Sequence, residues 1–513
     1  MDRRQFLNAA LLSTLASTVA ATAMGFSPSS VASSVLSSKG QRSLSPYAKK
    51  FNDKLSEHSR LRCYEGVKND IPAHFQPWHG KLPKQLIGHD FYRNGPALRA
   101  RGNERYQHFF DGDGMVNHFG LSQQGMTHKG KFVRTQKFME EHAANQFLYS
   151  GTGTRFENVA LPNSAQSVSQ ANTALLPIQG ELWAMWEAAS PYRVDRSSLD
   201  TLGQVKFNDA LDGVPFSAHP HHDKDGSIWN FGNISYSGKP TMVLYHLHAN
   251  GALREFKLIE LSQSSYIHDF AITDKYLVFY LSPLVLDRLS DVYVESFKWQ
   301  PHLGGELLVI DKNTLTASHR IPFEAGFIFH FGNSWQQGNN LVLNTCWYDD
   351  AYVYHTGMAD LIAEKQSNKK ANASQIIIDL TAQRAKLVRT LRDMEFPMFD
   401  ARYAQQKSEW QTGVTTGVQG SRSQFNAVGR YNQDKDIFER FDFGLDVMVE
   451  EPLFIAKDNA TREGQGYLIH SYINFVKGST GVAVFDAERI PDGPLAYANL
   501  PYYLPLGLHG TFI

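Results

Sequence analysis

The sequence has 513 residues, with 50 lysines and arginines against 51 aspartates and glutamates, and 42% of its residues are apolar. This balance excludes the basic excess of a nucleic-acid-binding protein and the acidic runs of a disordered tail. Only two cysteines occur, Cys63 and Cys346. A disulfide framework and thiolate metal clusters are therefore excluded, and a single disulfide between these two residues is the one pairing that the sequence allows.

The N-terminal region has the composition of a targeting segment. Arg3 and Arg4 precede an apolar, alanine-rich stretch that ends near Ala23. This order predicts a twin-arginine-type signal peptide over residues 1–23. Residues 24–45 are rich in serine and predict a flexible linker. We therefore expect a single periplasmic domain over residues 46–513, either soluble or in peripheral contact with a membrane.

Short apolar runs separated by turn residues make up most of the remaining chain. Residues 241–248 and 253–261 flank Asn250 and Gly251, which is a strong hairpin signal. Many short strands without a βαβ alternation predict an all-β sandwich, barrel or propeller. Further predicted strands occupy residues 276–281, 306–310, 341–347, 466–476 and 481–486.

Helical patterns are few in this sequence. Residues 359–366 and 379–389 are the best candidates for helices. Residues 281–299 are predicted to form a packed cap helix. The alternative for this segment is an apolar mouth, including Leu286 and Leu289, that touches a membrane to collect a lipophilic substrate.

Four of the 20 histidines stand in distinctive local sequences: His219, His268, His330 and His509. They are separated by 49, 62 and 179 residues, unlike the closely spaced ligands of a zinc knuckle or helix. The spacing would place them at similar points of repeated blades of about 60 residues each. His221 and His222 follow His219, and we expect both to be exposed because neighbouring strand residues point in opposite directions.

Ten short motifs surround and connect these histidines, and in this order they resemble the carotenoid cleavage oxygenase family. That family includes apocarotenoid- and stilbene-cleaving enzymes and the vertebrate retinoid isomerase. The resemblance covers nearly all of the chain after the predicted linker. The motifs are YRNGP (92–96), FDGDGM (110–115), ANTA (171–174), LWAMWE (182–187), SAHP (217–220), HDFAIT (268–273), FH (329–330), EFP (395–397), EPLF (451–454) and PLGLHG (505–510).

The resemblance implies a seven-bladed β-propeller with a cap of helices and loops over one face. It also implies that one Fe(II) ion is held by the four histidines named above. Glu187, Glu395 and Glu451 match the family's carboxylates that accept hydrogen bonds from ligand histidines, an arrangement that fixes ring orientation and tautomer. Thr173 matches the residue beside an open iron position, and Asp269 is expected to be structural.

The implied reaction is the cleavage by O2 of a conjugated C=C bond in a carotenoid or apocarotenoid, which gives two carbonyl products. The sequence contains no recognisable serine or cysteine nucleophile motif, in agreement with this chemistry. A second possible reaction is cleavage of a stilbene or phenylpropene, for which Tyr106 and Lys137 mark the region where phenol contacts are expected. The sequence is also compatible with a non-oxidative isomerase, or with a propeller that binds a ligand without catalysis.

Overall fold

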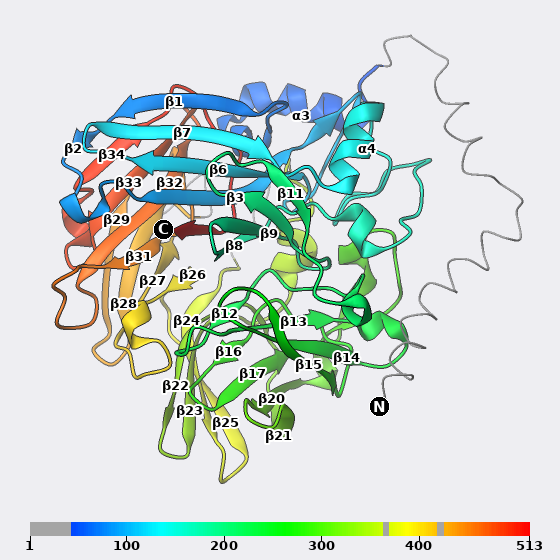
Figure 1. Ribbon diagram of the computed structural model, residues 1–513, viewed down its shortest axis with the longest axis vertical. Helices are drawn as coiled ribbons and strands as arrows, with labels where there is room; N and C mark the ends of the chain where they lie inside the picture. Colours follow the sequence, from blue (N-terminus) through cyan, green and yellow to red (C-terminus); the bar gives the residue numbers. More distant parts are fainter. Residues whose placement is uncertain (1–42, 363–368, 418–424) are drawn as a thin grey trace, which may run out of the picture.

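The computed structural model describes residues 43–362, 369–417 and 425–513 (Figure 1). The predicted signal peptide and residues 24–42 of the predicted linker lie outside these ranges, as do residues 363–366 of one predicted helix. Within the described ranges, no helix is both long and apolar enough to cross a bilayer. Helix α3 (Pro46–Glu57) is the first element described, and the Ser45 hydroxyl accepts a hydrogen bond from Ala48 N at 3.3 Å at its N-terminus.

Seven antiparallel sheets of four or more strands are found in the described residues, and they form the blades of a β-propeller. This confirms the predicted fold class. Blade 1 contains β35 (Gly510–Phe512), β3 (Asp90–Leu98), β6 (Asp113–Leu121), β7 (Gly125–Phe132) and β1 (Ile71–Pro77); blade 2 contains β8 (Ala174–Ile178), β9 (Glu181–Met185), β10 (Tyr192–Asp195) and β11 (Thr201–Gln204); blade 3 contains β12 (His221–His222), β13 (Ile228–Asn233), β14 (Thr241–Leu247) and β15 (Leu253–Glu260).

The remaining four blades follow in chain order. Blade 4 contains β16 (Ala271–Ile272), β17 (Tyr276–Leu281), β20 (Gly305–Asp311) and β21 (Thr316–Phe323); blade 5 contains β22 (Phe327–Gln337), β23 (Asn340–Tyr348), β24 (Asn372–Asp379) and β25 (Arg384–Val388); blade 6 contains β26 (Glu395–Met398), β27 (Trp410–Thr415), β28 (Ala427–Asn432) and β29 (Ile437–Asp442); blade 7 contains β30 (Val447–Val449), β31 (Leu453–Ala456), β32 (Gly466–Asn474), β33 (Ser479–Asp486), β34 (Ala496–Asn499) and β2 (His79–Gly80).

The ring is closed by strands from both ends of the described chain. The last strand, β35, pairs antiparallel with β3 in blade 1, with Arg93 opposite Gly510. The early strand β2 pairs with β34 at the outer edge of blade 7. Figure 1 shows the blue strands β1 and β2 beside the red strands of blade 7. Blades 1 and 7 are therefore joined by hydrogen bonds at two places.

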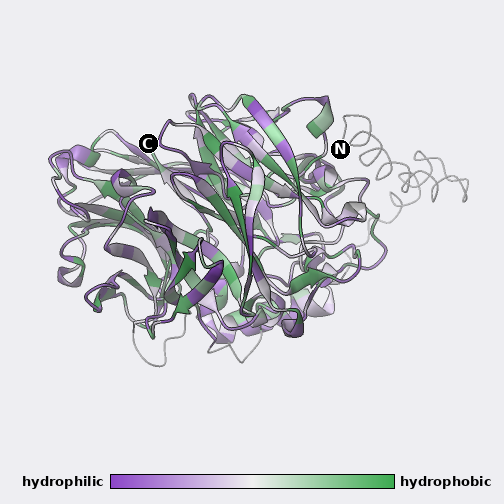
Figure 2. Ribbon diagram, turned by 90° about the horizontal axis from the view of Figure 1, so that it is seen from below, coloured by the Kyte–Doolittle hydropathy of each residue, from purple (hydrophilic) through white to green (hydrophobic). Residues whose placement is uncertain are grey.

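Apolar side chains from neighbouring blades meet between the sheets and form the core. Phe231 of blade 3, for example, packs edge-on against Phe270 and Phe279 of blade 4, with ring centroids 5.8 and 5.5 Å apart. Figure 2 shows hydrophobic residues along the strands and hydrophilic residues in many of the outer loops. Each fully buried phenylalanine stabilises the fold by about 1.5–3 kcal/mol. These contacts hold the inner strands in fixed positions around the axis.

Two predicted helices are strands instead. Residues 379–389 form the turn and second strand of the β24–β25 hairpin, in which Asp379 pairs with Arg384 and its carboxylate accepts a hydrogen bond from Ala382 N at 2.8 Å. Residues 281–299 contain the β18 (Leu284–Leu286) and β19 (Phe297–Trp299) hairpin with a short 3₁₀ turn. Cross-strand pairing overrides the local helical pattern at both sites.

The third predicted helix, residues 359–366, is a turn over its described part, and it follows a short π-helical segment (Val353–Gly357). A second α-helix, α4 (Gln136–Ala144), and a small hairpin of β4 (Ala100–Arg101) and β5 (Glu104–Arg105) precede blade 2. These segments contribute to the cap over one face of the propeller. Cys63 and Cys346 are both free and buried, in separate apolar clusters, so they do not form a disulfide.

Gly510 provides a test of ring closure, because a Cβ atom there would lie 2.5 Å from the carbonyl oxygen of Tyr92 on β3. We expect Gly510→Val to lower the free energy of unfolding by about 1–3 kcal/mol, since backbone at such a contact has to move. Urea denaturation measures this change. Thr511→Val, one residue further along the same strand, is the matched control, and an equal midpoint for the two variants would contradict the prediction.

Candidate metal centre

Four histidines meet on the propeller axis. His219 precedes β12, His268 precedes β16, His330 lies on β22 and His509 immediately precedes β35, so each comes from the innermost part of a different blade. One ring nitrogen from each histidine lies within 4.8 Å of the others. The structure thus brings together all four of the histidines that the sequence singled out.

The spacing of the ring nitrogens fits one shared metal ion. His219 Nε2 and His268 Nε2 are 2.9 Å apart, which is the separation expected for two imidazoles bound at right angles to an ion at about 2.1 Å. His330 Nε2 is buried and has no hydrogen-bond partner. A buried imidazole nitrogen without a partner is costly, and a metal ion at this point would satisfy it.

Each of the other three blades contributes one carboxylate, and each carboxylate accepts a hydrogen bond from the Nδ1 atom of one histidine in the cluster. Glu187, after β9 of blade 2, accepts from His268 Nδ1 at 2.7 Å. Glu395, at the start of β26 in blade 6, accepts from His330 Nδ1 at 2.6 Å. Glu451, before β31 in blade 7, accepts from His509 Nδ1 at 2.8 Å. These bonds leave Nε2 of each ring free to face the axis.

His219 differs from the other three histidines. Its Nε2 faces His268, and no hydrogen bond joins its ring to a carboxylate within the described residues. Burial lowers the pKa of His219 well below its usual value, and the neighbouring His268 adds to this effect. A neutral imidazole is the protonation state that binds a metal.

At the histidines that are bonded to carboxylates, burial and the neighbouring charges shift the pKa in opposite directions. Burial opposes a charge on His330, but the adjacent Glu395 carboxylate raises the pKa of His330. Burial likewise opposes ionisation of Glu451, yet His509 and Arg93 lower the pKa of that carboxyl. The Glu395 and Glu451 carboxylates thus place negative charge around the cluster, which a metal ion at its centre would offset.

Two polar residues that support the carboxylates were not identified as functional from the sequence. Tyr266 donates its hydroxyl proton to Glu187 Oε1 at 2.6 Å. Arg93 donates from Nη1 to Glu451 Oε2 at 3.3 Å and is buried. Tyr266 lies two residues before His268 and Arg93 lies in the YRNGP motif, so proximity to recognised motifs was the only sequence signal.

The expectation that both His221 and His222 are exposed was wrong for His221. His222 is exposed as predicted, but His221 is partly buried, and its Nε2 lies 2.7 Å from Asp269 Oδ1. Asp269 also accepts a hydrogen bond from Phe331 N at 2.8 Å. It thereby links blades 3, 4 and 5 next to the metal centre, which is the structural role expected for it.

Thr173 lies just before β8 and is buried. Its carbonyl oxygen accepts a hydrogen bond from His509 N at 3.2 Å, and its hydroxyl donates to Asn172 Oδ1 at 3.1 Å. The backbone of Thr173 thus positions one histidine of the cluster.

A largely apolar pocket lies beside the cluster, and both Phe396 and Glu451 line it. Phe396 also packs against the rings of His330 and His509, with centroid distances of 4.9 and 5.2 Å. Phe396 has a φ of 52°, a strained conformation for a bulky residue that is typical of functional sites. Other pocket residues include Tyr64, Phe109, Val353, Met358, Phe425, Met448 and Leu506.

Tyr106 and Lys137 are fully buried in the cap region, and the Lys137 ammonium donates a hydrogen bond to Tyr106 Oη at 2.7 Å. The same ammonium donates to Glu141 at 2.6 Å and to Asp113 at 3.3 Å. The rings of Phe147 and Phe156 pack against Tyr106. Tyr106 and Lys137, which marked the region where phenol contacts were expected, thus bond to each other inside the protein, and neither lines the pocket beside the cluster.

A four-histidine centre on the axis of a seven-bladed propeller defines a class of metal-dependent oxygenases. The family model of RPE65, the retinal pigment epithelial membrane protein, matches residues 64–513. The chain belongs to this family, the carotenoid cleavage oxygenases, and is an enzyme of the carotenoid oxygenase type.

Relatives within the family act on different compounds, as their names state. The chain is 26% identical over 500 residues to apocarotenoid-15,15'-oxygenase from Synechocystis sp., covering 94% of this chain and 99% of that protein. It is 24% identical to isoeugenol monooxygenase from Pseudomonas nitroreducens, covering 85% and 93%. Among solved structures, lignostilbene dioxygenase from Pseudomonas brassicacearum has a TM-score of 0.77 at 22% identity, with 88% of this chain and 97% of that one covered.

The histidine cluster and its carboxylates provide the second prediction. We expect His330→Ala to abolish stoichiometric binding of a divalent metal ion and Glu395→Gln to weaken it about 10- to 100-fold, because the carboxylate holds the histidine ring. Metal analysis and competition with a chelator measure both effects. His222→Ala is the matched control and should bind the metal ion as the unmodified protein does. Full metal binding by His330→Ala would show that the cluster is not the metal site.

Proposed function

We propose that this protein is an iron-dependent oxygenase that cleaves a conjugated C=C bond with O2. The observation that supports this most directly is the set of four buried histidines with converging ring nitrogens, three of them held by carboxylates. His219, His268, His330 and His509 would hold one Fe(II) ion, and Glu187, Glu395 and Glu451 would orient three of these ligands. The iron would supply open coordination positions at which O2 could be activated, and the four electrons that reduce O2 would come from the cleaved C=C bond.

The protein's own residues would position the substrate and exclude water. Phe396 covers one side of the histidine cluster and lines the pocket, so it can place an apolar double bond next to the metal. No side chain has to act as a nucleophile, since both new C–O bonds take their oxygen from O2. Cleavage of the C=C bond with one oxygen atom added to each carbon gives two carbonyl products.

The first candidate substrate is an apocarotenoid or carotenoid. The pocket at the cluster is lined mainly by aromatic and aliphatic side chains, which suits a long apolar polyene. The relative from Synechocystis carries an apocarotenoid in its name and aligns over almost its whole length. Charged side chains also line the pocket, Arg60, Asp360 and Lys369 among them, and they would contact a polar end group.

The second candidate substrate is a phenolic stilbene or phenylpropene. The buried Lys137–Tyr106 pair does not contact the pocket at the cluster, and the Lys137 ammonium already donates to Tyr106, Asp113 and Glu141. A phenol hydroxyl would instead meet the charged side chains that line the pocket, such as Arg60 and Lys369. The names of the isoeugenol and lignostilbene relatives agree with this candidate.

Product analysis with ¹⁸O₂ tests the reaction and separates the candidates. Anaerobically purified, Fe(II)-loaded protein is mixed with ¹⁸O₂ and a panel of carotenoids, apocarotenoids, stilbenes and phenylpropenes, and the products are identified by mass spectrometry. We expect ¹⁸O-labelled carbonyl products that disappear in His330→Ala, and the compound consumed identifies the substrate class. Absence of products from every member of the panel, with iron bound and the fold intact, would refute the proposed reaction.

We also propose that the protein is exported to the periplasm through its N-terminal arginine pair. The support is the order of Arg3, Arg4 and the following apolar stretch. We expect the double substitution Arg3→Lys and Arg4→Lys to keep the protein in the cytoplasmic fraction, whereas the unmodified protein appears in the periplasmic fraction. Immunoblotting of the two fractions measures this, and an unchanged distribution would contradict the proposal.

A further inference from the structure

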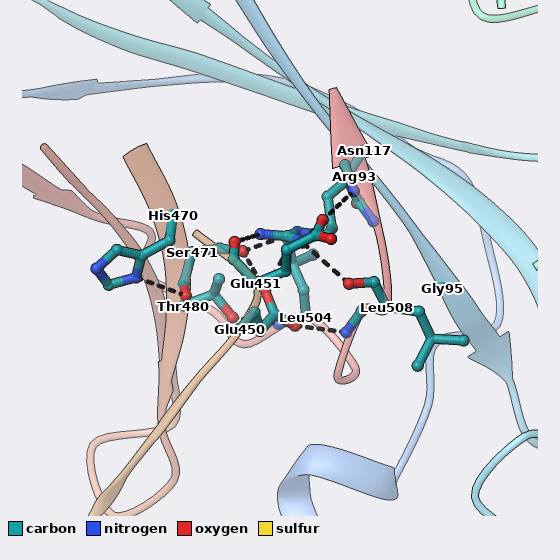
Figure 3. A network of polar contacts seen from close by, with 12 residues as sticks. Arg93, Gly95, Asn117, Glu450, Glu451, His470, Ser471, Thr480, Leu504 and Leu508 are labelled. Carbon is teal, nitrogen blue, oxygen red and sulfur yellow. Dashed lines mark hydrogen bonds and ion pairs between the residues drawn. The ribbon is translucent and has the colours of Figure 1, made fainter. Parts of the chain in front are cut away.

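Arg93 is a buried cation beside the metal centre. It lies on β3, opposite Gly510 of the closing strand β35, and its side chain is 2% exposed. Its guanidinium donates to Glu451 O at 2.6 Å, Glu451 Oε2 at 3.3 Å, Leu508 O at 3.0 Å and Ser471 Oγ at 3.3 Å (Figure 3). One planar group therefore contacts three separate segments of the chain.

These contacts lie at both ends of the hydrogen bond between Glu451 and His509. Leu508 is the residue before His509, so Arg93 holds the peptide group that leads into the histidine. Arg93 also holds the main chain of Glu451 and its second carboxylate oxygen, while the first oxygen accepts from His509 Nδ1. Gly510 N donates to the same second oxygen at 2.8 Å. The donor and the acceptor of this bond are thus fixed by one side chain.

Glu450 balances the charge of Arg93 on the other side. Its carboxylate oxygen Oε2 lies 3.8 Å from Arg93 Nε, and the carboxylate accepts hydrogen bonds from Ser471 Oγ and Gly507 N. Although Glu450 lines the pocket, these bonds turn its carboxylate towards the protein. A buried arginine between two carboxylates is stable only while all of its partners are in place.

The other two carboxylates are supported differently. Glu187 receives a hydrogen bond from the neutral hydroxyl of Tyr266, and Glu395 receives one from Phe396 N at 2.9 Å. Glu451, in contrast, is held by Arg93 of blade 1, a charged group that donates hydrogen bonds both to its carboxylate and to its main chain. The segment that carries His509 is also bonded to Arg93 and to the rest of β3, which lie about 415 residues earlier in the sequence.

We propose that Arg93 is a positioning residue of the metal centre, which fixes Glu451 and the peptide before His509 so that His509 Nε2 is presented to the ion. The proposal rests on the proposed function in that it requires the histidine cluster to bind a metal. Arginine suits the role better than lysine, because its rigid fork can donate in several fixed directions at once, whereas an ammonium is a point charge.

The test compares Arg93→Lys, Glu451→Gln and the double variant with the unmodified protein. Fe(II) affinity is measured anaerobically by competition with a chromophoric chelator, and the visible spectrum of the Co(II)-loaded protein reports ligand geometry. We expect Arg93→Lys to weaken Fe(II) binding about 10- to 100-fold and to change the Co(II) spectrum. In the Glu451→Gln background the same substitution should have a smaller effect than in the unmodified protein, because part of the action of Arg93 passes through the Glu451 carboxylate.

Arg430→Lys is the matched control. Arg430 is a largely buried arginine on β28 of blade 6, and it pairs with Glu439 at 2.6 Å. We expect this variant to keep the Fe(II) affinity and the Co(II) spectrum of the unmodified protein. A loss equal to that of Arg93→Lys would mean that any change to a buried arginine disturbs the site, and it would overturn the proposal.

Two further outcomes would also overturn it: an unchanged affinity and spectrum in Arg93→Lys, or effects of Arg93→Lys and Glu451→Gln that simply add. Failure of the unmodified protein to bind Fe(II) would refute the proposed function instead. If circular dichroism shows that Arg93→Lys does not fold, Ser471→Ala removes one acceptor of the guanidinium and keeps the charge. We expect that variant to bind Fe(II) about 2- to 10-fold more weakly, and unmodified affinity would reject the proposal.

Discussion

The hydrogen bond from an imidazole Nδ1 to a buried carboxylate has two effects at this site. It fixes the tautomer, so that Nε2 faces the axis with a free electron pair, and it prevents the ring from turning. Each carboxylate comes from a different blade from the histidine that it holds, so the bond also depends on the packing between blades. His219 has no carboxylate partner among the described residues and is held among the other rings. The centre therefore combines three oriented ligands with one that has more freedom to adjust.

The seven residues of the cluster are distributed one to a blade. His509 comes from blade 1, Glu187 from blade 2, His219, His268 and His330 from blades 3 to 5, and Glu395 and Glu451 from blades 6 and 7. Inner strands converge on the axis, so one residue from each can reach the same small volume. A propeller can thus assemble a metal centre from positions far apart in sequence without any close ligand spacing.

Much of this site could be predicted from the sequence, because the histidines and glutamates lie in short motifs whose order is distinctive. The hairpin around Asn250 and Gly251 was also evident, since turn chemistry is local. The strand over residues 384–388 was wrongly predicted as part of a helix. Its conformation is decided by its pairing with β24, whereas its local sequence has a helical pattern. The roles of Arg93 and Tyr266 could not be foreseen, since they depend on which strands become neighbours when the ring closes.

The position of β35 has a consequence for biosynthesis. More than four hundred residues separate β3 from the strand that completes its sheet, so a ribosome makes blades 2 to 7 before blade 1 can receive its innermost strand. Until then the nascent chain carries three of the four histidines, and the edge of β3 remains open to other strands. The four-histidine cluster therefore cannot assemble until the segment with His509 and β35 has been made, and a chain cut short before His509 would lack one of the four histidines.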